Sequence, residues 1–271
     1  MKLNKRRKIC LVLIALFACA LTFAGLKGWS SWKKKTDFVR KVDKMRALVY
    51  SFYEICSIFE RKDAPIIDNY MACNTRDKAL GSWRMGCLYH EYKIDCGGTT
   101  AYKRIEGGED FGKRYHPFKS WNEEPNYSYH LDYLCKNDDP RSPHYNEASV
   151  MTIVGDDTAF NNMQKIHDAS VFDSKINENF SPSAILFIEA VDSGIHWGQP
   201  GDFDLETVSK EQLFPGDTEG ILIVFSDWDI WYIENSVPME TLKHFMTVKS
   251  SKEHDREKEL SPYGRKIRNA G

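Results

Sequence analysis

The chain lacks the short motifs by which most enzymes can be recognised from sequence. It contains no glycine-rich phosphate loop, no nucleophile elbow and no Cys–His catalytic motif. His90-Glu91 is followed by Tyr-Lys-Ile, so the zincin pattern H-E-x-x-H is absent too. No internal repeat is present. We therefore predict a protein that is not an enzyme and that uses no cofactor.

Acidic residues are missing from the first 35 positions, and every charge is missing from Ile9 to Leu26. Ten of these 18 residues are Ile, Leu, Val or Phe, which favours membrane insertion by roughly 3–6 kcal/mol. At about 1.5 Å rise per residue such a helix is about 27 Å long, close to the thickness of the hydrocarbon core. We predict a transmembrane helix over residues 9–26.

Basic residues at positions 2, 5, 6, 7 and 8 crowd the N-terminal side of this span. Under the positive-inside rule they hold the leader, residues 1–8, in the cytoplasm, and everything after Leu26 is exported. Trp29 and Trp32 suit the far interface. We expect a single-pass protein of the inner (cytoplasmic) membrane. A cleaved secretory signal is the alternative, because it also combines a basic leader with an apolar core.

The first 35 residues carry nine Lys or Arg, so the formal total of −2 leaves −11 for the rest of the chain. An acidic exported part argues against nucleic acid as a partner and against docking on an anionic membrane surface. The lipid bilayer around the span is the partner that the sequence itself predicts.

Apolar residues recur after the span at alternating steps of four and three, as in a helix with one buried face. The stripe consists of Phe38, Val42, Met45, Val49, Phe52, Cys56 and Phe59. Pro65 requires the helix to end before it. Residues 27–61 are therefore predicted to form a juxtamembrane linker and an amphipathic helix, which packs on a sheet in preference to a coiled coil.

Residues 62–248 are predicted to form an exported, β-rich domain. Val150–Val154 and Ala184–Val191 indicate buried strands. Gly220–Phe225 and Ile230–Ile233 flank a four-residue turn and indicate a hairpin. Residues 249–271 are dominated by charge without an apolar repeat, which predicts a disordered tail. The predicted fold class is α+β, with the long N-terminal helix packed on an antiparallel sheet.

Cysteines and acidic pairs give the remaining candidate sites. Cys73, Cys87 and Cys96 are close enough in sequence to link one loop region by a disulfide, with the connectivity open. Cys87, His90 and Cys96 are also zinc-ligand types, but no fourth ligand stands at a familiar spacing, which favours a disulfide or surface role. Alternating aspartates, which suit either calcium or turn chemistry, favour the turn; these pairs are Asp202 with Asp204 and Asp227 with Asp229.

The most specific tract runs from Ser183 to Phe203, where an apolar strand ends in Glu189 and a Trp197-x-x-Pro200-x-Asp202 turn follows. It resembles the signature of the DUF1559 family, bacterial pilin-like proteins abundant in planctomycetes. Further pieces follow in that family's order: Ser82-Trp83-Arg84, Leu88-Tyr89, Cys135-Lys-Asn-Asp138, Val154-Gly155, Thr158-Ala159-Phe160 and Gly220–Asp227. The resemblance covers about residues 38–248.

The resemblance implies a pilin-like fold and structural roles for eight motif residues: Trp83, Cys135, Gly155, Glu189, Trp197, Pro200, Asp202 and Asp227. Glu189 lies inside an apolar strand, so its carboxylate needs a partner, for which a backbone amide or an arginine is favoured over a catalytic role. Two family features are absent. The prepilin cleavage signal is missing, and Phe214 and Trp228 replace the family's His and the Gly of its Asp-Gly pair.

Together these features predict a non-enzymatic, membrane-anchored, pseudopilin-like envelope protein, with other pseudopilin-like or envelope proteins as partners. The alternative is a membrane-tethered module that binds a glycan or peptide outside the cytoplasm. Aromatic residues that would line such a cleft are Tyr115, Trp121, Tyr127, Tyr129 and Tyr133.

Overall fold

The computed structural model describes residues 32–52, 82–85, 120–124, 126–128, 130–137, 139–160 and 180–267. The chain divides into two compact units, Met1–Asp43 and Lys44–Gly271. The predicted span over residues 9–26 and the cysteines Cys73, Cys87 and Cys96 lie outside the described residues. Within the described ranges, no helix is long and apolar enough to cross a membrane.

Residues 32–52 are helical. The first turn, from Trp32 to Thr36, is exposed. In the second unit the helix buries Met45, Leu48 and Phe52, which follow one another at steps of three and four and so share one face. The predicted stripe is confirmed at Val42, Met45 and Phe52, while Cys56 and Phe59 lie outside the described residues. It is wrong by one position at Val49, which is only half-buried, whereas Leu48 is fully buried.

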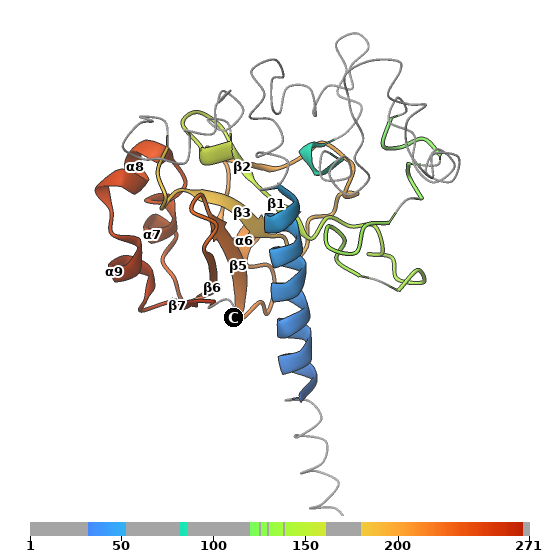
Figure 1. The fold of residues 1–271 in the computed structure, drawn as a ribbon, viewed down its shortest axis with the longest axis horizontal. Helices are drawn as coiled ribbons and strands as arrows, with labels where there is room; N and C mark the ends of the chain where they lie inside the picture. Colours follow the sequence, from blue (N-terminus) through green and yellow to red (C-terminus); the bar gives the residue numbers. More distant parts are fainter. Residues whose placement is uncertain are drawn as a thin grey trace, which may run out of the picture. The chain divides into compact units, whose positions relative to one another are not determined.

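A five-stranded antiparallel sheet with strand order β1-β3-β5-β6-β7 forms the centre of the second unit (Figure 1). Its strands are β1 (Val150–Met151), β3 (Ile185–Glu189), β5 (Gly220–Phe225), β6 (Ile230–Glu234) and β7 (Gly264–Lys266). A separate parallel pair joins β2 (Ile153–Val154) to β4 (Phe203–Asp204). The predicted α+β class with an antiparallel sheet is confirmed.

The predicted strand Val150–Val154 is divided in two at Thr152. The Thr152 amide donates to Asp202 Oδ1 at 2.9 Å, and its hydroxyl donates to the Leu186 carbonyl at 2.7 Å. These bonds take the residue out of regular pairing, so β1 pairs with β3 while β2 pairs with β4. The strand is therefore divided by hydrogen bonds of Thr152 to distant residues, which the pattern of apolar residues in the sequence cannot predict.

Aromatic rings seat the end of the long helix on the sheet. The Phe52 ring meets the Phe187 ring of β3 edge-on, with centroids 4.9 Å apart. Trp83, in the short 3₁₀ helix η1 (Trp83–Met85), stacks on Phe187 at 4.9 Å and contacts Phe52 at 6.0 Å. The predicted packing of an amphipathic helix on a sheet is therefore observed at its C-terminal described residue.

The predicted hairpin is confirmed, since β5 and β6 pair in antiparallel register. Its turn contains Trp228 with φ +68°, in the left-handed region that favours glycine. The DUF1559 family, which this tract of the sequence resembles, carries Gly at this position. The Trp228 amide donates to the Phe225 carbonyl at 2.9 Å, and its ring contacts Phe52 at 6.3 Å, so the turn and its contact hold the strained backbone.

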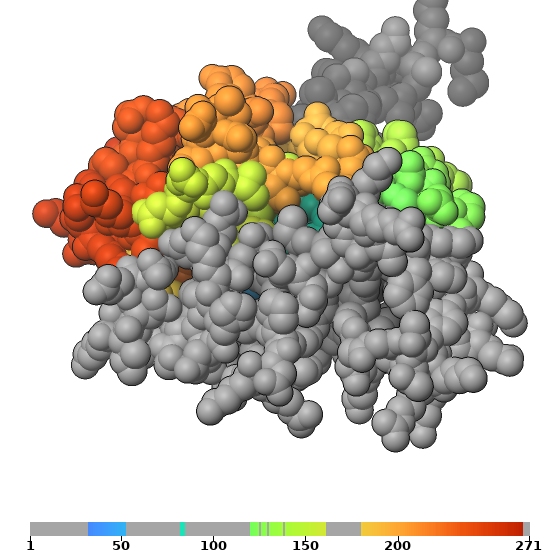
Figure 2. Space-filling model, turned by 90° about the horizontal axis from the view of Figure 1, so that it is seen from above, coloured from blue at the N-terminus to red at the C-terminus, as the bar shows by residue number. Residues whose placement is uncertain are grey.

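The prediction of a disordered tail over residues 249–271 is wrong for the described residues up to 267. Four short helices are described C-terminal to β4: α6 (Lys210–Leu213), α7 (Met239–Lys243), α8 (Val248–Glu253) and α9 (Arg256–Leu260). Strand β7 follows α9 and pairs with β6. Figure 2 shows this segment, in red, packed against the orange part of the chain. Helix α7 ends at Lys243, and the Thr247 side chain caps the start of α8.

Arg256 explains how so charged a segment docks. Its guanidinium donates to both Asp227 carboxylate oxygens, at 3.0 and 2.7 Å, and to Asp229 at 2.9 Å. It also donates to the Pro182 carbonyl and covers the Phe225 ring at 4.5 Å. Leu260, fully buried, adds an apolar anchor. One of the charges that predict disorder is thus paired with two carboxylates and used to hold the segment on the sheet.

Replacing Phe52 by Asp should lower the free energy of unfolding of the second unit by more than about 3–5 kcal/mol, the usual cost of truncating a buried Phe, because the carboxylate is also desolvated. Tyr50→Asp is the matched control, since Tyr50 lies two residues away and is 62% exposed. Urea unfolding of the full-length chain in detergent measures both. Equal stability of the two variants would contradict packing of the helix on the sheet.

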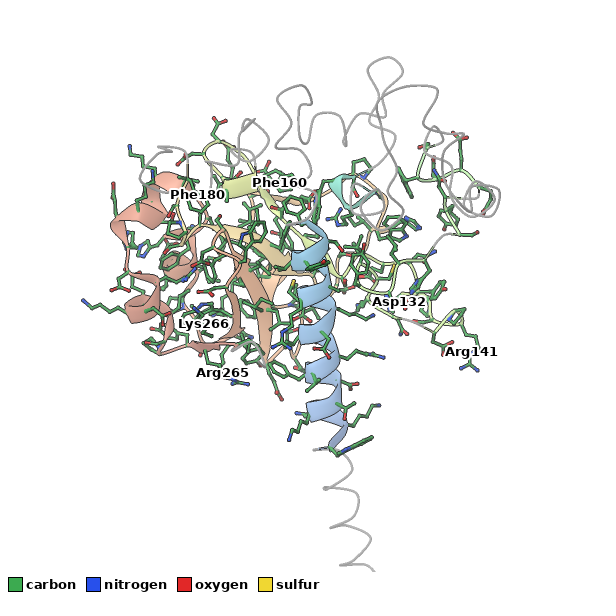
Figure 3. All side chains as sticks on the ribbon, in the orientation of Figure 1. Asp132, Arg141, Phe160, Phe180, Arg265 and Lys266 are labelled. Carbon is green, nitrogen blue, oxygen red and sulfur yellow. The ribbon has the colours of Figure 1, made fainter. Side chains whose placement is uncertain are left out.

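Arg256→Ala should destabilise the unit by about 2–4 kcal/mol, since it leaves Asp227 and Asp229 without their main cation in a half-buried site. Arg141→Ala is the control, because that side chain points into solvent and pairs with its near neighbour Asp139 (Figure 3). Thermal unfolding should separate the two. If residues 249–267 stay protease-resistant in the Arg256→Ala variant and its melting temperature is unchanged, the Arg256 ion pairs do not hold this segment on the sheet.

Candidate functional site

A buried ion pair links two of the sequence motifs. Arg84 is fully buried, and its Nη2 donates to Asp202 Oδ1 at 2.7 Å. The same carboxylate oxygen accepts the Trp83 indole N–H at 3.2 Å and the Thr152 amide at 2.9 Å. Arg84 also donates to the Val150 carbonyl at 2.7 Å and to the Gly201 carbonyl at 3.1 Å. We call Trp83, Arg84, Thr152 and Asp202 the motif junction.

Backbone hydrogen bonds extend the motif junction along the Trp197 tract. The Ser82 amide donates to the Gly198 carbonyl at 2.9 Å, and the Ser82 hydroxyl donates to the Trp197 carbonyl at 3.0 Å. Trp197 itself is 1% exposed. The Ser-Trp-Arg piece and the Trp-x-x-Pro-x-Asp piece, more than 100 positions apart in sequence, therefore form one structure.

The electrostatics of the motif junction favour a structural role. Burial raises the pKa of Asp202, opposed by the Arg84 guanidinium and by hydrogen bonds from Thr152, Trp83 and Arg84. The Trp83 indole, the Arg84 guanidinium and the Thr152 amide all donate to the same oxygen, Asp202 Oδ1. A carboxylate so enclosed orders its neighbours and is shielded from a substrate.

The other motif residues also have structural environments. Glu189 Oε2 accepts the Leu222 backbone amide at 3.0 Å, which confirms the predicted amide partner. Gly155 has φ +142°, and a Cβ there would lie 2.8 Å from Leu205 Cβ, so only glycine fits. Cys135 is fully buried, and its carbonyl accepts from Lys44 Nζ at 3.1 Å. Pro200 is exposed, at the turn between Trp197 and Asp202.

The acidic pairs considered for calcium are engaged by cations and turns. Asp202 pairs with Arg84, while Asp227 and Asp229 pair with Arg256. Asp227 Oδ1 also accepts the Asp229 amide at 3.1 Å, a bond typical of an Asx turn. These contacts support the turn interpretation over calcium.

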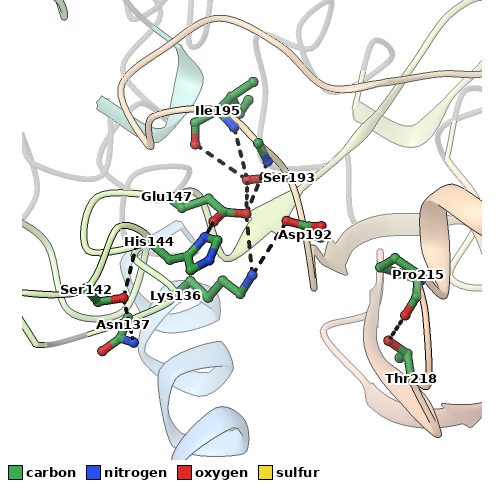
Figure 4. Close-up of polar contacts among 11 residues, drawn as sticks. Lys136, Asn137, Ser142, His144, Glu147, Asp192, Ser193, Ile195, Pro215 and Thr218 are labelled. Carbon is green, nitrogen blue, oxygen red and sulfur yellow. Dashed lines mark hydrogen bonds and ion pairs between the residues drawn. The ribbon is translucent and has the colours of Figure 1, made fainter.

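A polar cluster on the described surface surrounds Glu147 (Figure 4). Glu147 accepts from the Gly194 amide at 3.1 Å and hydrogen-bonds His144, and Lys136 Nζ lies 3.6 Å away. Burial acts to raise the pKa of Glu147, but the Gly194 amide, His144 and Lys136 together hold it below its usual value. Asp192 lies 3.8 Å from the same Lys136. The cluster joins the loop at 136–147 to the tract at 192–194.

Two of the aromatic residues considered for a ligand cleft stack on a neighbouring histidine, and a third, Tyr133, is half-buried. Trp121 and Tyr127 both stack on the imidazole of His196, with centroids 5.5 and 5.2 Å away. Burial lowers the pKa of His196, opposed by its hydrogen bond with the Tyr127 carbonyl. Tyr115 and Tyr129 lie outside the described residues. These contacts order a loop and give the ligand-binding alternative no specific support.

Comparison with known proteins gives no relative from which a function could be transferred: no family model, no curated protein and no solved structure matches this chain. The function is therefore inferred from the residues of this chain and their contacts.

Two clusters were missed by sequence reasoning. One is His144, Glu147 and Asp192, and the other is His244, His254 and Glu259. The intervals in the second, ten and five positions, match no metal-binding motif, and the two histidines gain significance only when α7, α8 and α9 are placed together. The signal in the sequence that could have led to His244 and His254 is their position in a charged segment, provided that this segment is expected to fold.

Asp202→Asn should cost about 3–5 kcal/mol of folding free energy, because it leaves the Arg84 guanidinium buried without a counter-charge. Asp192→Asn, on a 62% exposed side chain in the same tract, should cost under about 1 kcal/mol. Denaturant unfolding followed by tryptophan fluorescence compares them. Similar small losses in both variants would exclude a central role for the ion pair.

Proposed function

We propose that this chain is a non-enzymatic, membrane-anchored, pilin-like envelope protein whose long N-terminal helix carries a sheet domain outside the cytoplasmic membrane. The observation that carries the proposal is the amphipathic helix over 32–52, which follows the predicted span closely and whose far end is buried on the sheet domain. A helix built in this way is suited to a membrane tether with a folded head.

The near end of the helix suits a membrane interface. Only residues 27–31 separate the predicted span from the helical residues. Trp32 is 58% exposed, and Lys33, Lys34 and Lys35 beside it are exposed as well. Tryptophan rings and lysine chains in this arrangement favour the headgroup region of a bilayer. The first turn therefore has the chemistry of a helix leaving a membrane.

The far end of the helix suits a fixed connection. Met45, Leu48 and Phe52 are buried within the second unit, and Lys44 donates to the Cys135 carbonyl. A flexible tether would leave these side chains exposed. The described motif residues likewise serve packing and turns, which favours a scaffold or an envelope component over an enzyme.

Membrane extraction tests the anchor. The full-length chain should resist alkaline carbonate, and its intact mass should begin at Met1. Ile14→Lys combined with Leu16→Lys should release it, since two charges cost about 5–7 kcal/mol, whereas the eight remaining Ile, Leu, Val and Phe residues favour insertion by only about 2–5 kcal/mol. Val39→Lys with Tyr50→Lys adds the same charge at exposed helical positions and should remain membrane-bound.

A wild-type chain recovered in the soluble fraction would contradict the anchor, as would a double variant at positions 14 and 16 that stays embedded. A mass lacking the leader through Lys8 would replace the permanent anchor by prepilin-type processing.

A further inference from the structure

We propose that His244, His254 and Glu259 form a binding site for a divalent transition-metal ion of the zinc class, which would link the three C-terminal helices. The proposal is independent of membrane anchoring, because it depends only on contacts within the second unit.

The three side chains already converge. His244 follows α7, His254 follows α8, and Glu259 lies in α9. Each imidazole Nδ1 lies 2.8 Å from a different oxygen of Glu259, and the two rings stack with centroids 3.6 Å apart. One nitrogen or oxygen atom from each residue falls within 4.8 Å of the others. Small side-chain movements bring such atoms to about 2.0–2.2 Å from one ion.

The donor set selects the ion. Two imidazole nitrogens and one carboxylate oxygen are typical of zinc sites that retain an open position for water. The Glu259 carboxylate supplies the oxygen ligand of this set. Side-chain exposures of 38%, 27% and 27% for His244, His254 and Glu259 leave access for an ion.

Buried neighbours hold the ligands in place. Phe245, next to His244, is fully buried and contacts the His254 ring, and Leu260, next to Glu259, is fully buried as well. Metal binding requires the two stacked rings to splay, because a metal lies in the plane of each imidazole that binds it, and it requires the Glu259 carboxylate to move back from the two Nδ1 atoms. The backbone thus presents all three ligands from anchored positions.

The cluster around Glu147 provides the contrast. It also combines a histidine with two carboxylates, but the Lys136 ammonium lies 3.6 Å from Glu147 and 3.8 Å from Asp192. That fixed positive charge opposes a cation at the same place. In the C-terminal cluster each Glu259 oxygen instead faces an imidazole Nδ1, and an imidazole nitrogen can bind a metal ion in place of a proton.

The test uses the full-length chain in detergent, freed of metal with a chelator, and Zn²⁺ as the ligand in equilibrium dialysis. We expect the wild type to bind one equivalent of Zn²⁺. His254→Ala and Glu259→Gln should each weaken this binding by more than about a hundredfold, which exceeds the usual effect of losing an outer-shell partner. His144→Ala should bind like the wild type. Co²⁺ as a spectroscopic probe should give a spectrum without thiolate charge transfer, which excludes the cysteines as the source of that equivalent.

Glu259→Gln guards against a folding artefact, because the amide still accepts a hydrogen bond and the variant should melt like the metal-free wild type. Zn²⁺ should raise the melting temperature of the wild type and of His144→Ala, and leave that of Glu259→Gln unchanged. The proposed site would be wrong if the wild type bound no Zn²⁺. It would also be wrong if His254→Ala and Glu259→Gln both bound Zn²⁺ as tightly as the wild type. Neither result would bear on membrane extraction.

Discussion

The buried ion pair between Arg84 and Asp202 is the interaction on which the second unit depends. Desolvating both charges costs several kcal/mol per ion, so the pair is tolerable only with further hydrogen bonds. Those bonds are present, to the carbonyls of Val150 and Gly201 and from the Thr152 amide. Arg84 lies 66 positions from Val150 and 118 from Asp202. One side chain thereby fixes three distant tracts.

The layered packing follows from this pair. Trp83, beside Arg84, is held against Phe187 of β3, and together they form the surface that receives Phe52. The motif junction therefore positions Trp83, which in turn contacts the Phe52 ring at the end of the helix.

The pattern of apolar and turn residues in the sequence predicts the strands and turns that are stabilised by neighbouring residues or by burial of apolar side chains. The buried strand around Ile185–Glu189 and the β5–β6 hairpin follow from continuous apolar runs beside turn residues. The tail was missed because its order comes from Arg256 reaching Asp227, 29 positions away. Trp83, Arg84 and Asp202 stood in recognised motifs, yet their mutual contact could not be read from spacing. The same holds for His244, His254 and Glu259, which three helices bring together.

A double-mutant cycle at Arg84 and Asp202 tests the central claim most directly. Arg84→Met, Asp202→Leu and the combined variant would be unfolded by urea in the full-length chain. Each single variant should lose about 3–5 kcal/mol, and the combined variant should lose less than their sum by about 1–3 kcal/mol, because neither charge is then left buried alone. Losses that add to within about 0.5 kcal/mol would contradict the pair as the organising interaction.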